Sequence, residues 1–238
     1  MLKFIKRRPP EAPAGNALPP ALDLSEARRV LVIAPHPDDE TLGCGGTLAQ
    51  LAPFAEISVL LVTNGDGAGG LPEGASDTRK AEMAQALKLL GVNRPITCFD
   101  EPDGAFTNNP AFRKRLRTLL DEVRPNWVFV PWLLDSHSDH SRIARASCEV
   151  LARSRGVDKV LFYEIWTPVP ATHVVDITAT ALVKRQALLC HQTVMPHGNY
   201  VDASFGLAQY RAMYVPSREA RFAEVFTVRS AADCARAA

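Results

Sequence analysis

Residues 30–46 read VLVIAPHPDDETLGCGG, and this stretch decides the fold. It opens with the short apolar run 30–34, which is typical of a strand buried on both faces of a sheet. Two prolines follow and disfavour helix for the residues before them, so the run ends in a stiff turn. Three glycines after the turn allow close backbone approach as a helix begins. The stretch therefore predicts a strand, a tight turn and a helix.

The same alternation of short apolar runs and helical patterns continues along the chain. Leu116, Leu119 and Leu120 illustrate the helical spacing of apolar residues. Strands of this kind, separated by helices, are typical of a parallel sheet covered on both faces. We predict one α/β domain with a Rossmann-like, doubly wound, mostly parallel sheet that contains the strand order 3-2-1-4-5. The predicted strands are 30–34, 57–63, 96–99, 127–131, 160–165, 174–177 and 221–228, and the predicted helices are 43–51, 77–90, 110–123, 141–153, 178–190 and 203–214.

Three helix ends carry recognisable signals. Asp77 is a candidate N-cap, Pro110 fits the first position of a helix, and Gly91 fits a C-terminal stop. Each signal makes a prediction about where a helix begins or ends.

The first 25 residues differ from the rest, because five of the 18 prolines fall within the first twenty positions. We expect residues 1–25 to form a flexible, proline-rich arm and residues 26–238 to form the domain. The arm is basic, but no apolar stretch of a secretory signal follows it, and no run approaches the ~20 residues of a membrane span. We therefore expect a soluble protein without a transmembrane segment.

Overall composition excludes several classes of protein. The 238 residues are 47% hydrophobic and 22% charged, which excludes a wholly disordered chain. The formal net charge of +1 provides no basic surface for nucleic acid. Five cysteines without a C-x-x-C pair indicate reduced thiols, and hence a cytoplasmic protein, rather than a disulfide framework.

The first polar cluster is His36, Asp38, Asp39 and Glu40, packed into the single turn after the first strand. Acids in a first helical turn also complement the helix dipole, so this cluster alone leaves a purely structural explanation open. A dinucleotide-binding turn is disfavoured. The glycines do not match G-x-G-x-x-G, and the acids would repel a pyrophosphate.

The second cluster lies in residues 131–140, PWLLDSHSDH, after the fourth predicted strand. It contains two histidines and two carboxylates within six residues. In the predicted strand order, strands one and four are neighbours, and their carboxyl ends form the crevice where open α/β sheets bind ligands. We therefore expect both clusters, about 100 residues apart in sequence, to meet in one cleft.

Imidazoles and a carboxylate without cysteine suit a divalent metal of the zinc type. A catalytic zinc site uses three protein ligands and leaves a position for water, and a further carboxylate beside it can act as general base. The two clusters together therefore predict a metallohydrolase. Two other classes stay open: a non-heme iron oxygenase with two histidine ligands and one carboxylate, and a non-catalytic sugar- or nucleotide-binding domain.

The two motifs resemble those of the PIG-L/LmbE-like zinc deacetylases, which remove the N-acetyl group from N-acetylglucosaminyl conjugates. The resemblance rests on residues 35–40, PHPDDE, with the glycines at 43, 45 and 46, and on residues 137–140, HSDH. Weaker similarities extend it over about residues 28–228. It implies Zn²⁺, or another divalent ion such as Fe²⁺, and an N-acetylated sugar or glycoconjugate as substrate. The natural acceptor and the oligomeric state stay undetermined.

The resemblance also implies a role for each motif residue. The metal ligands would be His36, Asp39 and His140. Asp38 would be the general base that polarises the attacking water. His137 would help to stabilise the oxyanion, and Asp139 would orient His137.

Two residues outside the motifs, Arg79 and Asp103, match positions near the substrate pocket of the family and would bind sugar hydroxyls. Each has a structural alternative. Arg79 could instead pair with Glu82, and Asp103 could be a turn residue before Gly104.

Other side chains invite a functional interpretation that the sequence does not favour. We expect His191 and His197 to be solvated or hydrogen-bonded loop residues, and Cys44 to be a small buried residue. The three aromatic residues that could stack on a sugar or simply pack are Trp132, Trp166 and Tyr200.

Overall fold

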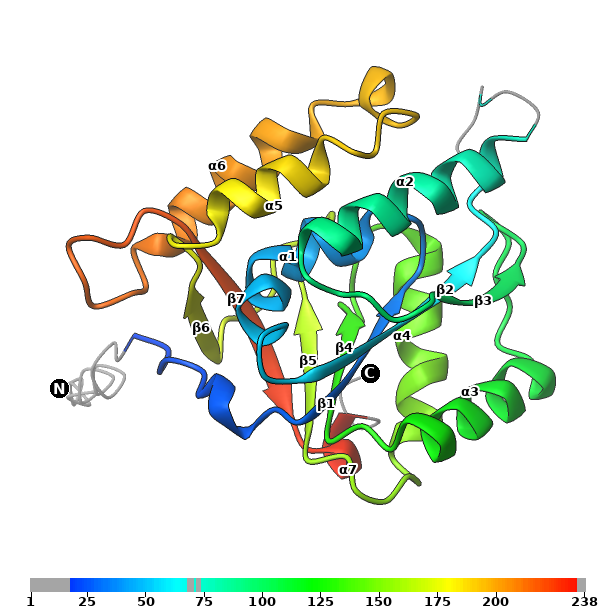
Figure 1. The fold of residues 1–238 in the computed structure, drawn as a ribbon. Coiled ribbons are helices and arrows are strands. Elements are labelled where there is room, and N and C mark those ends of the chain that lie inside the picture. Colours follow the sequence, from blue (N-terminus) through cyan, green and yellow to red (C-terminus); the bar gives the residue numbers. More distant parts are fainter. Residues whose placement is uncertain (1–17, 68–70, 72–73, 235–238) are drawn as a thin grey trace, which may run out of the picture.

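The computed structural model describes residues 18–67, 71 and 74–234. Their strands form one seven-stranded sheet in the order β3-β2-β1-β4-β5-β7-β6 (Figure 1). Strands β1 to β5 pair in parallel, and β7 runs antiparallel to both β5 and β6, so it alone among the described strands is reversed. The strands are β1 Arg29–Ala34, β2 Glu56–Thr63, β3 Thr97–Glu101, β4 Trp127–Pro131, β5 Lys159–Tyr163, β6 His173–Asp176 and β7 Ala223–Arg229. The predicted doubly wound α/β fold and the order 3-2-1-4-5 are confirmed.

Helices cover both faces of the sheet because the strands are apolar on both faces. Leu31 and Ile33 of β1 pack toward α3 and α4, whereas Val30 and Val32 pack toward α1 and α2. Two cores result, one on each side of the sheet. The helices are α1 Asp39–Leu51, α2 Ala75–Leu89, α3 Pro110–Val123, α4 Ser138–Leu151, α5 Ala181–Leu188, α6 Tyr200–Ala212 and α7 Ala231–Cys234, with 3₁₀ turns at Leu24–Glu26 and Met195–His197.

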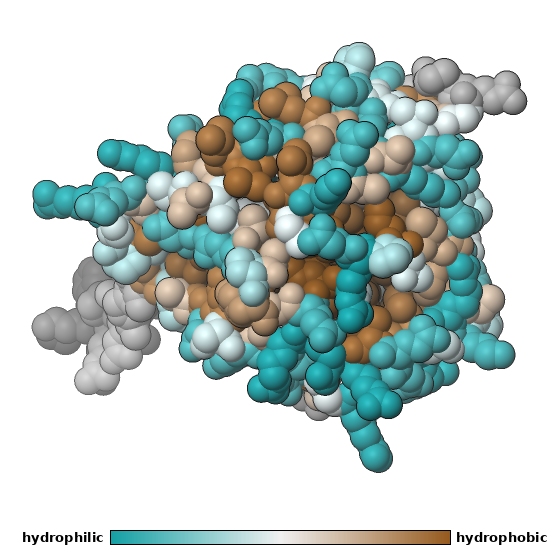
Figure 2. Space-filling model, in the orientation of Figure 1, coloured by the Kyte–Doolittle hydropathy of each residue, from teal (hydrophilic) through white to brown (hydrophobic). Residues whose placement is uncertain are grey.

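The outer helices α5 and α6 lie side by side (Figure 1). In the same view, Figure 2 shows hydrophobic side chains over these two helices and, between hydrophilic ones, across the middle of the molecule. Leu182 and Leu189 of α5 are among the exposed apolar residues. Both helices also border the pocket described below.

Two of the three predicted helix ends are confirmed. Pro110 begins α3, and Gly91, with φ +83°, follows the C-cap of α2. The Asp77 prediction is wrong. Helix α2 begins two residues earlier, after Gly74, whose left-handed backbone provides the N-cap. Helix α1 likewise begins at Asp39, four residues before the predicted start, so Asp39 lies in its first turn.

The predicted arm lies partly outside the described residues, which begin at residue 18. Within the described part, Leu22 is buried, and its N–H donates to the carbonyl of Val174 in the edge strand β6. The N–H of Val174 in turn donates to the carbonyl of Pro20. This segment therefore covers part of the open edge of the sheet. No helix within the described ranges is long and apolar enough to cross a membrane.

Replacing Gly43 by Ala is expected to lower the free energy of unfolding by about 1–3 kcal/mol, because the site is already fully packed. A Cβ at Gly43 would lie 2.1 Å from Cδ2 of Tyr163 and 2.9 Å from the carbonyl oxygen of Glu164. The Tyr163 ring is buried, and its hydroxyl donates to the carbonyl of Ile33 at 2.7 Å, so it has little room to move. Unfolding in urea measures the change in the free energy of unfolding.

Gly206→Ala in α6 is the matched control. Apart from its chain neighbours and the backbone of its own helix, no described atom lies within 4 Å of the new Cβ, so this substitution should stabilise the protein by about 0.5–1 kcal/mol. Equal effects of the two substitutions would contradict this packing argument.

Candidate active site

The turn after β1 is held in an unusual backbone conformation. Asp38 has φ +136° and ψ −27°, a region that residues with a Cβ seldom adopt. The turn is fixed on both sides, since the N–H and hydroxyl of Thr63 both donate to the carbonyl of Pro35. On the other side, the N–H of His36 donates to Oδ2 of Asp39 at 2.9 Å. Strain of this kind persists only where surrounding contacts hold it, and it is common at functional sites.

The second polar segment follows β4, which pairs directly with β1. His137 is the N-cap of α4, and His140 lies in the first turn of that helix. The two motifs meet at the carboxyl ends of these neighbouring strands, as their order predicted. His36, Asp38, Asp39, Arg79, Asp103, His137 and His140 all line one cleft.

Three atoms from the two motifs form a tight triangle. Nδ1 of His36 lies 3.1 Å from Nε2 of His140, and Oδ2 of Asp39 lies 3.2 Å from each of these nitrogens. Ligand atoms about 2.0–2.1 Å from a tetrahedral zinc ion lie about 3.3 Å from one another. The triangle therefore has the dimensions of one face of a tetrahedral metal site.

The charges around the triangle also suit a cation. Burial would lower the pKa of His140, but Asp39 and Asp135 raise it to about 9. Burial opposes a low pKa for Asp39 as well, yet the two histidines hold that pKa well below its usual range. The carboxylates around His36 likewise raise its pKa well above the ordinary value against the effect of burial. The carboxylates around the triangle thus favour a positive charge at this place, which a divalent ion would supply.

Alternative groupings of potential ligands overlap with this triangle. His36, His137 and His140 bring one ligand atom each within 4.8 Å of one another, and so do His36, Asp103 and Asp139. These sets are wider than the triangle of His36, Asp39 and His140. The residues present therefore fit a metal ion, and the shortest distances favour the ligand set that the family resemblance implies.

Carboxylates lie behind the two imidazoles of the triangle. Nε2 of His36 is 3.0 Å from Oδ1 of Asp103 and 3.4 Å from Oδ2 of Asp139. Nδ1 of His140 is 3.2 Å from Oδ1 of Asp135. Carboxylates in these positions fix the orientation and raise the basicity of histidines that bind metals.

Asp135 belongs to the second polar segment, residues 131–140, but no role was predicted for it from the sequence. Besides facing His140, it accepts hydrogen bonds from the backbone N–H groups of His137, Trp166 and Thr167. It thus connects the start of α4 to the loop after β5. The signal in the sequence was only its place two residues before His137.

Asp139 has a different partner from the one expected. Its carboxylate accepts the N–H groups of Gly104 at 2.7 Å and Phe106 at 3.2 Å and faces His36. What contacts the His137 ring is instead the backbone N–H of Asp139, which donates to Nδ1 of His137 at 3.3 Å. The carboxylate is therefore placed to orient His36, and the backbone of the same residue to orient His137.

His137 is half-buried and stacks on His140, with ring centroids 4.4 Å apart. Burial and the charges of His140 and His36 lower the pKa of His137. Since Nδ1 accepts a backbone hydrogen bond, the neutral ring carries its proton on Nε2. His137 is thus placed to offer a proton donor in the cleft.

Asp38 stands beside the triangle, with Arg79 opposite. Burial and the charge of Asp39 raise the pKa of Asp38 to about 8, against the opposing effects of Arg79 and His36. One guanidinium nitrogen of Arg79 is 3.7 Å from Oδ2 of Asp38 and donates to the carbonyl of Pro37. A second guanidinium nitrogen of Arg79, Nη1, donates to the carbonyl of Gly65 at 2.7 Å.

The two predicted sugar contacts, Arg79 and Asp103, are therefore held by protein groups in this structure. Arg79 is buried and Asp103 is half-buried, and Nη1 of Arg79 lies 3.8 Å from Oδ2 of Asp103. The alternative pairing of Arg79 with Glu82 is not formed, because Glu82 accepts the N–H and hydroxyl of Thr193 instead. Asp103 precedes Gly104 in a turn, as the structural alternative supposed, but its carboxylate also faces His36.

His191 contradicts the expectation of a solvated or hydrogen-bonded loop residue. It is 1% exposed, and among the described residues neither ring nitrogen has a hydrogen-bond partner. Burial lowers its pKa to about 4. Its Nε2 lies 4.0 Å from Oε1 of Glu40, at the start of α1. The loop after α5 packs against the first motif, which the sequence pattern did not reveal. His197 is exposed, as expected.

The remaining side chains that the sequence singled out divide between core and cleft. Cys44 is fully buried, as expected, and burial raises the pKa of its thiol. Trp132 packs in the core, edge to face with Phe162. Trp166 and Tyr200 instead line the cleft, with ring centroids 6.0 Å apart.

A doubly wound α/β fold with a His/Asp cluster at its switch point defines the class of a candidate metal-dependent enzyme. The model of the PIG-L family, GlcNAc-PI de-N-acetylase, matches residues 31–151, and the chain belongs to this family. It is accordingly a deacetylase, a hydrolase that acts on amide bonds. Membership of a deacetylase family excludes the two alternatives that the sequence left open, a non-heme iron oxygenase and a non-catalytic binding domain.

Two relatives and one solved structure illustrate the similarity. A 1D-myo-inositol 2-acetamido-2-deoxy-alpha-D-glucopyranoside deacetylase of Rhodococcus opacus (strain B4) is 41% identical over 257 residues, covering 76% of this chain and 88% of that protein. The diacetylchitobiose deacetylase of Thermococcus kodakarensis is 28% identical over 198 residues, covering 72% of each. The structure of the N,N'-diacetylchitobiose deacetylase from Pyrococcus horikoshii has a TM-score of 0.75 and 24% identity, covering 88% of this chain and 86% of that one.

Proposed function

We propose that this deacetylase removes the N-acetyl group from an N-acetylglucosamine-type sugar or glycoconjugate, using a divalent metal ion, most naturally zinc. The observation that carries the proposal is the triangle of His36, Asp39 and His140 with Asp38 beside it. The names of two relatives supply the substrate class, since both act on acetylated amino sugars.

A zinc ion held by these three residues would polarise the amide carbonyl. It would also lower the pKa of a water molecule enough for that water to lose a proton at neutral pH. Asp38 is the group that accepts the proton of the attacking water. It is buried within the cleft, and it is free of the triangle that would hold the metal. Its carboxylate lies 3.7 Å from the guanidinium of Arg79, and this charge favours the ionised form that a base requires.

Asp38 accepts a proton, whereas His137 provides an N–H donor. The N–H at Nε2 donates a hydrogen bond to the oxyanion of the tetrahedral intermediate without losing its proton. The departing amine nitrogen takes up the proton that Asp38 received from the water, as the C–N bond breaks. Its ring is held by the N-cap hydrogen bond and by stacking on His140, so the donor is oriented before substrate binds. Asp103, Asp135 and Asp139 hold the ligand histidines in place.

Acetate release measured together with bound metal tests the proposal. The purified protein, loaded with one equivalent of zinc, should release acetate from N-acetylglucosamine or a simple glycoside of it. Removal of the ion by a chelator should abolish the release, and adding zinc back should restore it. A matched sample loaded with Fe²⁺ without oxygen identifies which ion supports hydrolysis.

Two results would contradict the proposal. One is an unchanged rate of release in fully demetallated protein. The other is the absence of release from every N-acetylated sugar tested while zinc is stoichiometrically bound.

A further inference from the structure

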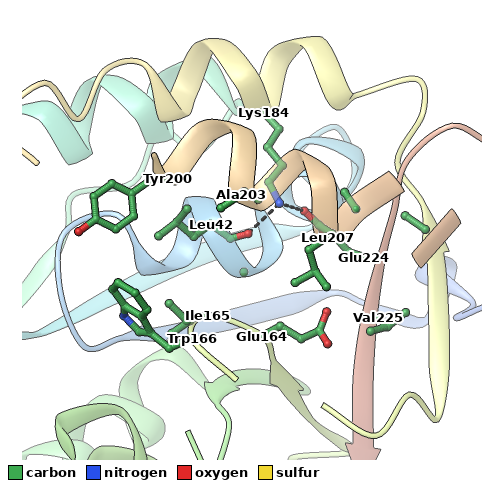
Figure 3. Close-up of a pocket in the computed structure, with 14 residues that line it drawn as sticks. Leu42, Glu164, Ile165, Trp166, Lys184, Tyr200, Ala203, Leu207, Glu224 and Val225 are labelled. Carbon is green, nitrogen blue, oxygen red and sulfur yellow. Dashed lines mark hydrogen bonds and ion pairs between the residues drawn. The ribbon is translucent and has the colours of Figure 1, made fainter. Parts of the chain in front are cut away.

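A second cavity adjoins the catalytic cleft and has no part in the mechanism above (Figure 3). It lies between α1, α6 and the strands β5 and β7, and its volume is about 130 Å³. Its apolar walls include Leu42 of α1, Ile165 after β5, and Ala203 and Leu207 of α6. Figure 3 shows these side chains around the cavity, with Tyr200 and Trp166 at one end.

The charged side chains in the cavity wall are already paired. Lys184 donates to the carbonyl of Leu42 at 2.7 Å and to Oε1 of Glu224 at 2.8 Å, the two contacts drawn in Figure 3. Glu224 also accepts the N–H groups of Gly46 and Thr47. These charges therefore serve the protein itself, and what the cavity offers a ligand is mainly apolar surface.

Glu164, the other acid in the wall, is paired as well. It accepts hydrogen bonds from the guanidinium of Arg211 and from the N–H of Val169. A charged ligand would have to compete with these buried contacts, whereas an apolar one would not.

The cavity and the cleft share three lining residues, Leu42, Trp166 and Tyr200. Leu42 lies three residues after Asp39 in α1. A molecule whose amide lies in the cleft can therefore extend past the two aromatic rings toward the apolar walls. The ring of an amino sugar is compatible with such aromatic neighbours, since its C–H face is apolar.

We propose that this cavity binds a short apolar group attached to the amino sugar, so that the preferred substrate is an apolar conjugate rather than the free sugar. The proposal rests on the proposed function. A cavity of about 150 Å³ holds one benzene molecule, so a space of this size suits an aromatic ring or a chain of about four to six carbons. The apolar group has two chemical sources, the substituent at the anomeric carbon and the acyl chain on nitrogen.

Two series of substrates separate these sources. The first contains the methyl, butyl and hexyl glycosides of N-acetylglucosamine. The second contains methyl glucosaminides that carry acetyl, butanoyl and hexanoyl groups on nitrogen. Release of the free amine reports kcat/KM for all of them. In one series kcat/KM should rise about fourfold for each methylene until the cavity is full. The series that rises identifies the source.

Variants of α6 test whether this cavity is responsible. Ala203→Phe should fill it, so the ratio of kcat/KM between the longest and shortest members of the rising series should fall to about one. Leu207→Ala should enlarge it and shift the optimum to longer chains. Gln209→Phe places the same ring on the same helix at an exposed position that, unlike Ala203, does not line the cavity, so it should leave the ratio unchanged. Thermal unfolding confirms that each variant is folded.

The outcomes distinguish failure of this proposal from failure of the proposed function. If no substrate of either series is deacylated, the proposed function fails. If all are deacylated with similar kcat/KM, the function stands and the apolar subsite is refuted. A chain-length preference that persists in Ala203→Phe would also overturn the assignment to this cavity.

Discussion

Asp38→Asn is expected to abolish most of the hydrolytic activity while leaving bound metal unchanged. Positioned general bases contribute about 10²–10⁴-fold to rates, so kcat should fall by that factor. The amide of Asn cannot accept a proton at neutral pH, although it has the shape of the carboxylate. It also tolerates positive φ better than most residues, which matters because Asp38 lies at φ +136°. Metal should stay bound because the triangle of ligand atoms comes from His36, Asp39 and His140.

The measurement is kcat for acetate release, with the metal content of the same sample determined by elemental analysis. Asp100→Asn is a matched control, because Asp100 is another aspartate at positive φ, with φ +53°, but it is exposed and paired with Lys80. It should retain full activity. Loss of metal from Asp38→Asn would show that Asp38 is a ligand. Retained activity with metal bound would show that another group is the base.

The sequence predicted the location of the site because polar residues stood directly after apolar runs. The run before His36 and the run before residues 131–140 could only be buried strands, and parallel strands in a doubly wound sheet place such ends together. The contact between His36 and His140, 3.1 Å across 104 positions, follows from that topology. Apolar patterning thus predicted the fold class, and the common strand order of that class predicted that the two motifs meet.

The partners of the histidines were not predictable in the same way. Whether Asp139 faces His36 or His137 depends on how the loop at Gly104 and Phe106 packs on the start of α4, and hydrophobic periodicity carries no information about that packing. Asp135 is similar, since its importance depends on the loop at Trp166, which is distant in sequence. Such roles arise from contacts between loops, which are set in three dimensions.

The buried His191 illustrates a second limit. A histidine after a helix in a stretch with Gln192 and Thr193 has the pattern of a solvated loop. The structure buries it against the first motif near Glu40, because the loop between α5 and α6 closes over α1. Local composition predicts exposure well only where no other element covers the segment.

His140→Ala is expected to lose both metal and activity. Nε2 of His140 is one of the three atoms of the triangle, and its removal leaves only His36 and Asp39 facing a divalent ion. Stabilisation of transition-state charge by a metal amounts to several kcal/mol, so kcat/KM should fall by about 10³-fold or more. The change also leaves the buried carboxylate of Asp135 without the imidazole that faces it, which should lower stability. His140→Asn keeps a polar group at the position and serves where the alanine variant unfolds.

His137→Ala is the control that makes this result specific. Its ring stacks on His140 and borders the same cleft, so it belongs equally to the wider group of candidate ligands. If His36, Asp39 and His140 are the ligands, His137→Ala should keep its metal and lose activity, because only the hydrogen-bond donor has gone. If His137→Ala instead releases the ion, the arrangement of His36, His137 and His140 holds the metal. Since His140 belongs to both ligand sets, the metal content of His137→Ala decides between them, independently of substrate.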